Sequence, residues 1–514
     1  MMIFGLLVLF PANAAELSWG DLDSQSRMYF EAGEYPKALA SGEKALAAAE
    51  MLYGPDHLNT AASMFNLAET YRRLGSYNNS ESHYFGALRI RERILGREHS
   101  QVAACYYGLA NIMAARGEYQ LAEDYAGQAL SVFQKTNGPA NVEVGNVYTV
   151  LAEVNKGLLK YQEAESFGTQ ALETFEKTAG PDSLETAKAL LLLASIRIKQ
   201  EKYTEASALL PRAEVIYLKN YRKKRLETGN FFYCQAEILR LQGEPKKAQG
   251  VYKKALKYFE KLSKNDPDLG KTLFALAACR KSGLKYQKAE ELQLQGLSIL
   301  EGSVGPQSII LEGPIREMAE LSALNRNYQP AVVYAYRLFK ICEERYGTKG
   351  LKTADALNRL ARIYLKSNRL SEAGTSSGQA IAIADSTGDS GNPEKATALL
   401  LMAKIKIRQG HFPAAQSDWE QASGLIKGFS ENKPLLAMEL LETEALLNVA
   451  QGNYLAAEPL LQKAIAEAEG VFGLFHSELA GLLKELSVLY RKEGRLKDAA
   501  AVEKRIKKIY SKIS

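Results

Sequence analysis

Residues that could take part in catalysis or metal binding are few in this 514-residue chain, and they do not cluster. The sequence contains none of the motifs that cradle nucleotide phosphates, expose a nucleophilic serine or place zinc ligands on a helix. Three of the five histidines, His57, His99 and His476, occupy the same position in separate copies of a repeat. Catalysis needs groups that converge on one pocket, so we expect no catalytic residue, metal site or cofactor, and we predict that the protein is not an enzyme.

The cysteines do not indicate a redox or metal function either. They are too few and too scattered for a disulfide scaffold, and no two of them form a CxxC pair. We expect all four to be small, buried packing residues: Cys105, Cys234, Cys279 and Cys342.

The remaining candidate is a binding surface on the first helix of each repeat, away from the packing face. Cations outnumber carboxylates there, and aromatic residues lie between them. Arginine binds a carboxylate through two parallel hydrogen bonds, so the surface would suit a peptide or protein partner with an acidic segment or a C-terminal carboxylate. Solvated cations that pair with glutamates on neighbouring turns are the alternative. The candidate partner-binding residues are Arg72, Arg73, Lys156, Arg240, Lys281, Arg316, Arg362, Lys366, Lys404, Arg408, Asn66, Tyr107, Tyr233 and Phe274.

A repeat of 42 residues must position these side chains. When the copies are aligned, small residues recur in three columns. Alanine or serine occupies one column before a turn (Ser26 to Ser487) and a second column after it (Ala38 to Ala499). A third column further along is mostly alanine (Ala45 to Ala464). A large residue recurs three positions before the second column, in steps of 42 residues with one step of 41. This column is Tyr35, Tyr77, Tyr119, Tyr161, Tyr203, Pro245, Tyr286, Tyr328, Leu370, Phe412, Tyr454 and Leu496.

The residues between these columns predict helical hairpins. In 64–71 the apolar residues recur with the spacing of one helix face. Glycines such as Gly75 and Gly117 lie where the chain must leave the first helix through a left-handed cap, and Pro36 falls in the first turn of the second helix. Small side chains in fixed columns let two helices approach closely. We therefore predict a fold made only of paired α-helices.

This pattern of small and large residues resembles the tetratricopeptide repeat, and the length of 42 residues is that of its kinesin-light-chain type. The connectors 54–57 and 96–99 and the segment 65–68 support the resemblance, which covers residues 18–512. It implies a right-handed superhelical solenoid of about twelve antiparallel helix-turn-helix repeats, with a concave groove for peptides. The groove asparagine of the family is present at Asn66, but the following units have Gly108, Val150, Leu192 and Cys234.

Irregularities in residues 205–270 predict a division of the array. Pro211 falls inside a helix, the connector 219–225 is strongly basic, and one residue is deleted near Pro267. We predict a change of superhelical pitch there, which separates units 1–5 in residues 16–220 from units 6–12 in residues 221–514. The second group would end in a basic C-terminal capping helix.

The N-terminus predicts export. An apolar run at 3–10 precedes an A-x-A site at 12–14, as in a secretory signal peptide of residues 1–14, although no lysine or arginine precedes the run. The run is too short for a transmembrane helix. We expect a periplasmic or secreted protein if this signal is used and a cytoplasmic one otherwise; a leader that packs on the first helix is the alternative.

Composition limits the possible functions further. A formal net charge of +6, with 46% hydrophobic and 24% charged residues, excludes a disordered tail and a multi-span membrane protein. The mild charge does not favour nucleic acid, and no small-molecule substrate is expected. We predict a non-enzymatic protein–protein interaction scaffold. The alternative is a regulatory or assembly module that acts in trans on a nucleic-acid-binding or NTPase partner. The oligomeric state stays open.

Overall fold

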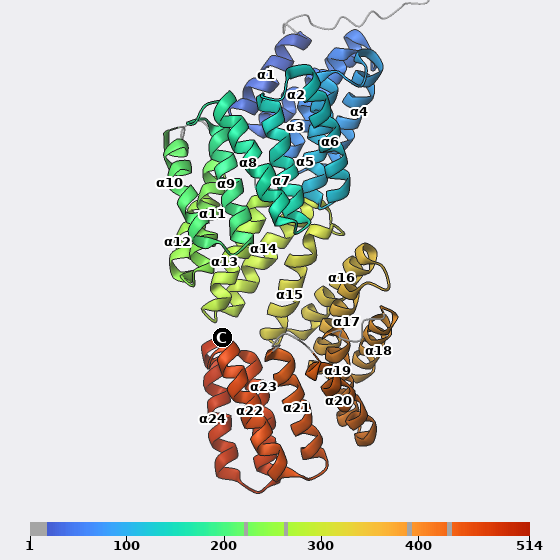
Figure 1. Ribbon diagram of the computed structural model, residues 1–514, viewed down its shortest axis with the longest axis vertical. Helices are drawn as coiled ribbons and strands as arrows, with labels where there is room; N and C mark the ends of the chain where they lie inside the picture. The colour runs from blue at the N-terminus through green and yellow to red at the C-terminus, as the bar shows by residue number, and fades with distance from the viewer. Residues whose placement is uncertain (1–17, 220–224, 262–265, 388–392, 429–433, 514) are drawn as a thin grey trace, which may run out of the picture. The chain divides into compact units, whose positions relative to one another are not determined.

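The computed structural model describes residues 18–219, 225–261, 266–387, 393–428 and 434–513 (Figure 1). The predicted signal peptide and most of the basic connector 219–225 lie outside these residues. Within them the chain forms 24 α-helices and one short 3₁₀ helix, with no strand, so the predicted all-α fold is confirmed. No described helix combines the length and the apolar content that a membrane crossing needs.

The chain divides into two compact units, the first of residues up to 228 with 260–266, the second of 229–259 and 267–514. In the first unit each helix up to residue 219 contacts its neighbour in chain order. Helix α11 (Arg225–Leu241) begins in the first unit and continues into the second. The other helices of the first unit are α1 (Trp19–Glu31), α2 (Tyr35–Tyr53), α3 (Leu58–Arg73), α4 (Tyr77–Leu95), α5 (Ser100–Arg116), α6 (Tyr119–Asn137), α7 (Val142–Gly157), α8 (Tyr161–Thr178), α9 (Leu184–Lys199) and α10 (Tyr203–Lys219).

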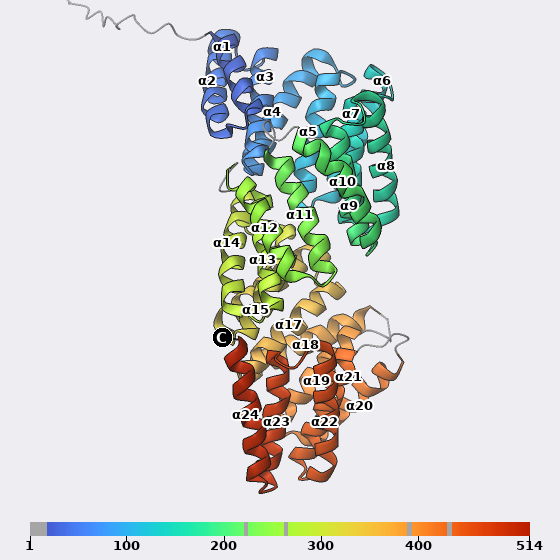
Figure 2. The ribbon, with the colours of Figure 1, turned by 90° about the vertical axis from the view of Figure 1, so that its left-hand side faces the viewer.

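The second unit has the same hairpin order, which Figure 2 shows from a second side. One first helix, α15, is short and is preceded by the 3₁₀ turn η1, which the repeat pattern did not predict. The elements are α12 (Pro245–Phe259), α13 (Pro267–Ser282), α14 (Tyr286–Val304), η1 (Ile309–Leu311), α15 (Glu312–Leu324), α16 (Tyr328–Tyr346), α17 (Leu351–Lys366), α18 (Leu370–Ser386), α19 (Pro393–Arg408), α20 (Phe412–Lys427), α21 (Pro434–Ala450), α22 (Tyr454–Phe472), α23 (Ser477–Lys492) and α24 (Leu496–Ile513).

The second helix of every hairpin begins at the large-residue column, from Tyr35 in α2 to Leu496 in α24. The turn predicted between the Ser26 and Ala38 columns is thus present before every position of the large-residue column. Helix α10 continues through Pro211, and whether it bends there stays a prediction. The predicted division at residues 220 and 221 also stays a prediction.

The first two alanine columns lie where the two helices of a hairpin cross. Their alanines are almost completely inaccessible to solvent, for example Ala68 and Ala122 at 0% exposure. At two positions where serine replaces alanine, the hydroxyl reaches the facing backbone: Ser26 Oγ donates to the Ala38 carbonyl at 2.9 Å, and Ser80 Oγ donates to the Ala68 carbonyl at 2.6 Å. A side chain of two heavy atoms therefore already spans the gap between the helices.

A larger residue in these columns should force the hairpin apart. We expect Ala38→Leu, at a site 0% exposed, to destabilise the protein by about 1–3 kcal/mol, because overpacking shifts the backbone. Ala47→Leu, on the exposed face of the same helix α2, should change the stability by less than about 0.5 kcal/mol. The measurement is the midpoint of thermal unfolding by circular dichroism; equal midpoints for the two variants would contradict the close crossing.

The turn inside each hairpin contains a residue in the left-handed region, and this residue is not always glycine. The predicted glycines adopt it, as at Gly75 (φ 74°) and Gly117 (φ 80°). At the equivalent position of other units, residues with a Cβ adopt the same conformation: Leu159, Glu201, Leu284, Arg326 and Asn368, with φ between 59° and 64°. The close crossing of the helices therefore imposes a left-handed turn residue even where the residue at that position disfavours positive φ.

Glycine at such a position should relieve strain. Leu159 is 70% exposed, so its side chain contributes little packing. We expect Leu159→Gly to stabilise the protein by about 0.5–1 kcal/mol, because the left-handed conformation disfavours side chains and the greater freedom of glycine in the unfolded chain offsets only part of this gain. The measurement is again the thermal midpoint, with Asn368→Gly as a comparison that should gain less, since asparagine tolerates this region. A lower midpoint for Leu159→Gly would refute the strain.

The second unit is closed by its last helix. Tyr510 of α24 packs against the cluster of Ala277, Tyr286, Ala289, Leu321 and Leu324, which belongs to α13, α14 and α15. The guanidinium of Arg326 lies 4.9 Å from the centre of the Tyr510 ring. The C-terminal helix therefore contacts helices that precede it by four or more hairpins.

Candidate partner-binding groove

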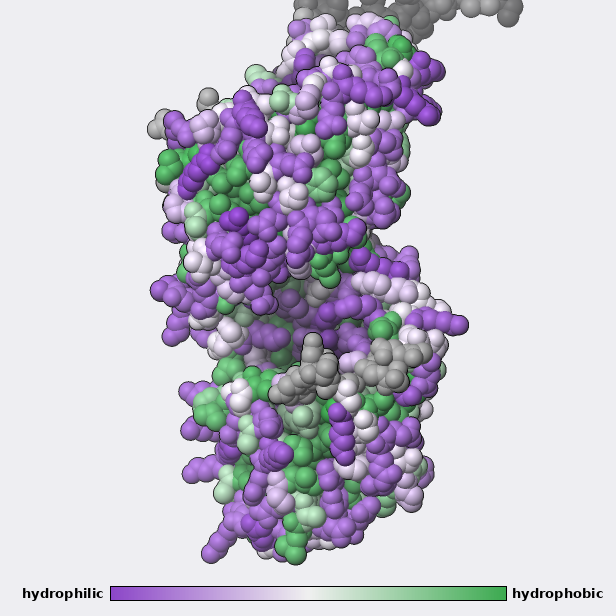
Figure 3. All heavy atoms as spheres, in the orientation of Figure 1, coloured by the Kyte–Doolittle hydropathy of each residue, from purple (hydrophilic) through white to green (hydrophobic). Residues whose placement is uncertain are grey.

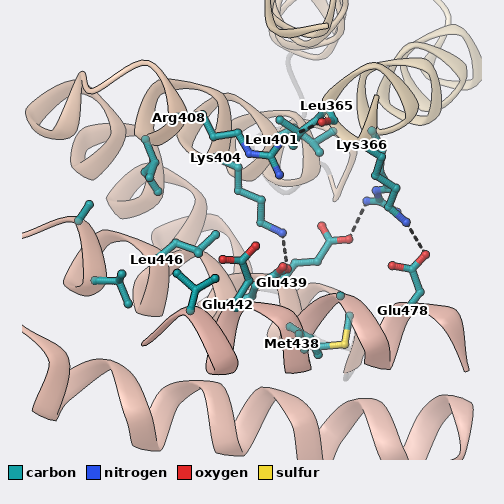
Figure 4. A pocket seen from close by; sticks show the side chains of 18 of the residues that line it. Leu365, Lys366, Leu401, Lys404, Arg408, Met438, Glu439, Glu442, Leu446 and Glu478 are labelled. Atoms are coloured by element: carbon teal, nitrogen blue, oxygen red, sulfur yellow. Dashed lines mark hydrogen bonds and ion pairs between the residues drawn. The ribbon is translucent and has the colours of Figure 1, made fainter. Parts of the chain in front are cut away.

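A cavity of about 480 Å³ lies among four consecutive first helices of the second unit, α17, α19, α21 and α23 (Figure 4). Each helix contributes charged residues one or two turns apart, which places them on one helix face. The predicted residues Arg362, Lys366, Lys404 and Arg408 all line this cavity. The structure thus brings together four of the fourteen predicted groove residues at one place.

The floor of the cavity is apolar. Leu365, Leu401, Met438 and Leu482 line it and are 2–7% exposed, so they also belong to the packed core. On the face of the molecule seen in Figure 3 hydrophilic residues predominate, with apolar residues interspersed among them. Apolar surface that covers the body of a ligand and polar groups that orient it are the two parts of a binding pocket, and this cavity has both, with charged side chains as the polar part.

Three ion pairs cross the cavity between helices. Lys404 Nζ lies 2.5 Å from Glu442 Oε2, and Figure 4 shows both side chains at the cavity wall. Arg362 pairs with Glu439 at 2.7 Å, and Lys366 pairs with Glu478 at 2.5 Å. Removal of one partner from such a partly buried pair leaves the other charge uncompensated, so these pairs hold the four helices in register.

Two cations and one carboxylate of the cavity lack an ionic partner among the described residues. Arg408 donates only to the Leu365 carbonyl, at 2.8 Å, and Lys492 lies exposed at the rim. Glu485 has neither a hydrogen bond nor an ion pair within the described chain. Burial, followed by the like charge of Glu442, raises the pKa of Glu485. The interior of the cavity therefore retains unused acceptors, and its rim retains unused donors.

Other predicted groove cations pair locally with glutamates. Arg72, Lys156, Arg240 and Arg316 each lie 2.6–2.8 Å from a glutamate three or four residues earlier in the same helix. Lys281 faces Glu320 of the next first helix at 3.9 Å. For these four cations the structure therefore contains the alternative given above, in which each cation pairs with a glutamate on a neighbouring turn of its own helix.

The other predicted groove residues lie apart from the cavity. Asn66 donates to Asp23 at 2.7 Å, which uses its amide inside the protein. Phe274 is 7% exposed and lies against the backbone of Gly296, where a Cβ would come within 2.9 Å of its ring, so it contributes to packing between α13 and α14. Tyr233 packs edge-on to Tyr252 with ring centres 5.9 Å apart. Tyr107 is half-buried, and the Nε of Arg73 is buried with no described hydrogen-bond partner.

Sequence reasoning did not single out the two carboxylates that α23 contributes to the cavity, Glu478 and Glu485. They lie seven residues apart on α23, in line with Lys492, and this spacing was the available signal. Their role could not be read from the sequence, because Glu478 meets a cation 112 residues earlier in the chain. Such a pairing depends on the curvature of the array.

The cysteines and histidines have structural roles. All four cysteines are free and buried, as predicted. The Nδ1 atoms of His57, His99 and His476 accept hydrogen bonds from the backbone at the start of α3, α5 and α23, at 3.1–3.2 Å, which caps these helices. Among the described residues, no group of His, Cys, Asp and Glu side chains is arranged to hold a metal ion.

The Lys366–Glu478 pair should make stability depend on pH. Burial alone would raise the pKa of Glu478, but the charge and hydrogen bond of Lys366, with Arg362, lower it to about 2. A carboxyl whose pKa is lower in the folded than in the unfolded state stabilises the fold fully above about pH 4.5, and this contribution is lost as the pH falls toward 2. We expect Glu478→Gln to lower the thermal midpoint at pH 7 and to flatten its decline between pH 5 and 3.

The matched control is Glu467→Gln, which changes an exposed glutamate of α22. It should leave both the midpoint at neutral pH and its decline unchanged. A Glu478→Gln variant with the decline of the wild type would show that this carboxylate is not held ionised by its partners.

The chain matches a known protein family. The model of the tetratricopeptide repeat matches residues 24–84, 66–135, 143–219 and 227–302, more than half of the chain. A curated relative is Protein KINESIN LIGHT CHAIN-RELATED 1 of Arabidopsis thaliana, which is 25% identical over 270 residues. The match covers 51% of this chain and 43% of that protein, so the chain spans less than half the length of this relative.

Solved structures of helical-repeat proteins are also similar. BtubC (BKLC) from P. vanneervenii is 22% identical, with 39% of this chain and 80% of that chain covered and a TM-score of 0.34. The apo form of RapI is 17% identical, with 55% and 98% covered and a TM-score of 0.43. A Rap protein complexed with competence and sporulation factor is 14% identical, with 72% and 98% covered and a TM-score of 0.49.

Proposed function

Because the chain belongs to the tetratricopeptide repeat family, as its sequence pattern predicted, we propose that it is a non-enzymatic scaffold that binds a segment of a protein partner. The binding surface is the face formed by the first helices α17, α19, α21 and α23. The observation that carries this proposal is the cavity of about 480 Å³ among these helices, which combines an apolar floor with charged walls.

The size and rigidity of the cavity support this function. Its volume lies within the range of roughly 300–1,000 Å³ that is usual for binding pockets. The pairs Arg362–Glu439, Lys366–Glu478 and Lys404–Glu442 fix six of its charged side chains before any partner arrives. Side chains that are already ordered lose less conformational entropy on binding, so the cavity is preorganised.

The charges of the rim support an acidic group in the partner. Three of the four predicted cations of the cavity are neutralised by glutamates, which leaves Arg408 and Lys492 as the cations without a described carboxylate partner. A carboxylate of the partner would bind at this rim, with an affinity of about micromolar that falls as salt increases.

The test is charge reversal at the rim. We expect the double variant Arg408→Glu/Lys492→Glu to recover the bound partner from extracts of the source organism about tenfold less efficiently than the wild type. Lys463→Glu/Lys497→Glu, which changes exposed lysines of α22 and α24 by the same total charge, should recover it normally. Recovery is measured by quantitative mass spectrometry, and circular dichroism verifies that both variants fold.

The position of the partner is then measured by hydrogen exchange of the purified complex. Protection should appear on α17, α19, α21 and α23. Equal recovery by both double variants, or protection confined to the second helices α18, α20, α22 and α24, would refute this binding surface.

A further inference from the structure

We propose that the cavity binds a basic side chain, arginine or lysine, of the partner's segment, with its cationic head held by the carboxylates of Glu439 and Glu485. This inference rests on the proposed function and adds the chemistry of the residue that enters the cavity. It differs from the acidic preference of the rim, because it concerns the interior.

The first observation is an unused acceptor on Glu439. This residue of α21 is 9% exposed, lines the cavity and pairs with Arg362 through Oε1 at 2.7 Å. Its second oxygen, Oε2, is buried and has no hydrogen-bond partner among the described atoms. Buried polar atoms are nearly always satisfied in folded proteins, so this oxygen indicates that a donor is missing from the cavity. Figure 4 shows Glu439 at the wall, beside Glu442 and opposite Lys404.

The second observation is the isolation of Glu485 on the neighbouring helix α23. Glu485 lines the same cavity, and within the described chain it forms no hydrogen bond and no ion pair. The groups that act on it are Glu442 from α21, Lys404 and Arg408 from α19, and Lys484 from its own helix. A cation beside Glu485 would relieve its repulsion from Glu442.

The third observation concerns the donors and the apolar floor. The interior cations Arg362, Lys366 and Lys404 already have carboxylate partners at 2.5–2.7 Å, so they offer little to an incoming anion. The floor would cover the methylene stem of a long basic residue, which commonly lies along apolar surface while its head reaches polar groups. Arginine fits best, because its planar fork donates to two acceptors at once.

The experiment uses acetylated, amidated hexapeptides as probes. One position is fixed as arginine, citrulline, glutamate or leucine and the others are randomised, and binding to the full chain is measured by affinity selection and mass spectrometry. Citrulline has the shape of arginine without its charge. We expect the arginine pools to bind about tenfold more tightly than the citrulline pools, as a charge-assisted pair with buried carboxylates requires.

Variants locate the effect. Glu485→Gln should reduce the preference for arginine over citrulline to less than about threefold, and it should fold normally because Glu485 has no ion pair to lose. Glu439→Gln should have the same effect but also weakens the pairing of Arg362, so Glu485→Gln is the decisive variant. Glu467→Gln, on the exposed face of α22, should keep the full preference.

The outcomes separate the two proposals. Equal binding of the arginine and citrulline pools, or a preference that survives Glu485→Gln, would overturn the basic side chain while the cavity remains a peptide site. No binding of any pool to the wild-type chain would overturn the cavity as a peptide site and this inference with it.

Discussion

The close approach of two helices at each alanine column is the constraint on which the rest of the structure depends. Because the gap is only as wide as a serine hydroxyl can bridge, as at Ser26 and Ser80, the two helices of a hairpin have one relative position. This position fixes where the next hairpin packs. Every first helix consequently presents the same face, and the cavity of the second unit is formed by that face of four successive first helices.

The local part of this architecture could be predicted from the sequence, because it follows from side-chain size and helical spacing. The starts of the second helices at Tyr35 to Leu496 and the buried alanines are of this kind. The left-handed turn was predictable only where glycine occurs; at Leu159 or Glu201 the helix crossing overrides the local preference. The pairs Arg362–Glu439 and Lys366–Glu478 join helices two and three hairpins apart, so they depend on a curvature that no local pattern encodes.

The ion pairs of the cavity reduce the number of its cations that can bind a partner. A count of lysines and arginines on the first helices describes an electropositive groove, but eight of the ten cations predicted for it are already matched by glutamates of the described residues. The charges of the cavity that remain for recognition are those without a complete set of partners. They are the cations Arg408 and Lys492 at the rim and the carboxylate oxygens of Glu439 and Glu485 inside. Specificity in such a groove is therefore determined by what the array leaves unpaired rather than by its total charge.

The contact of Tyr510 with Arg326 and with α13 to α15 has a mechanical consequence. A repeat array in which neighbours touch only neighbours unravels from its ends, one hairpin at a time. Here the last helix also contacts an early part of its own unit. A force applied at the C-terminus must therefore break the contacts of Tyr510 before α23 and α24 can unfold. The hairpins that contain the cavity lie in sequence between the two ends of this contact, so they would unfold together rather than one after another.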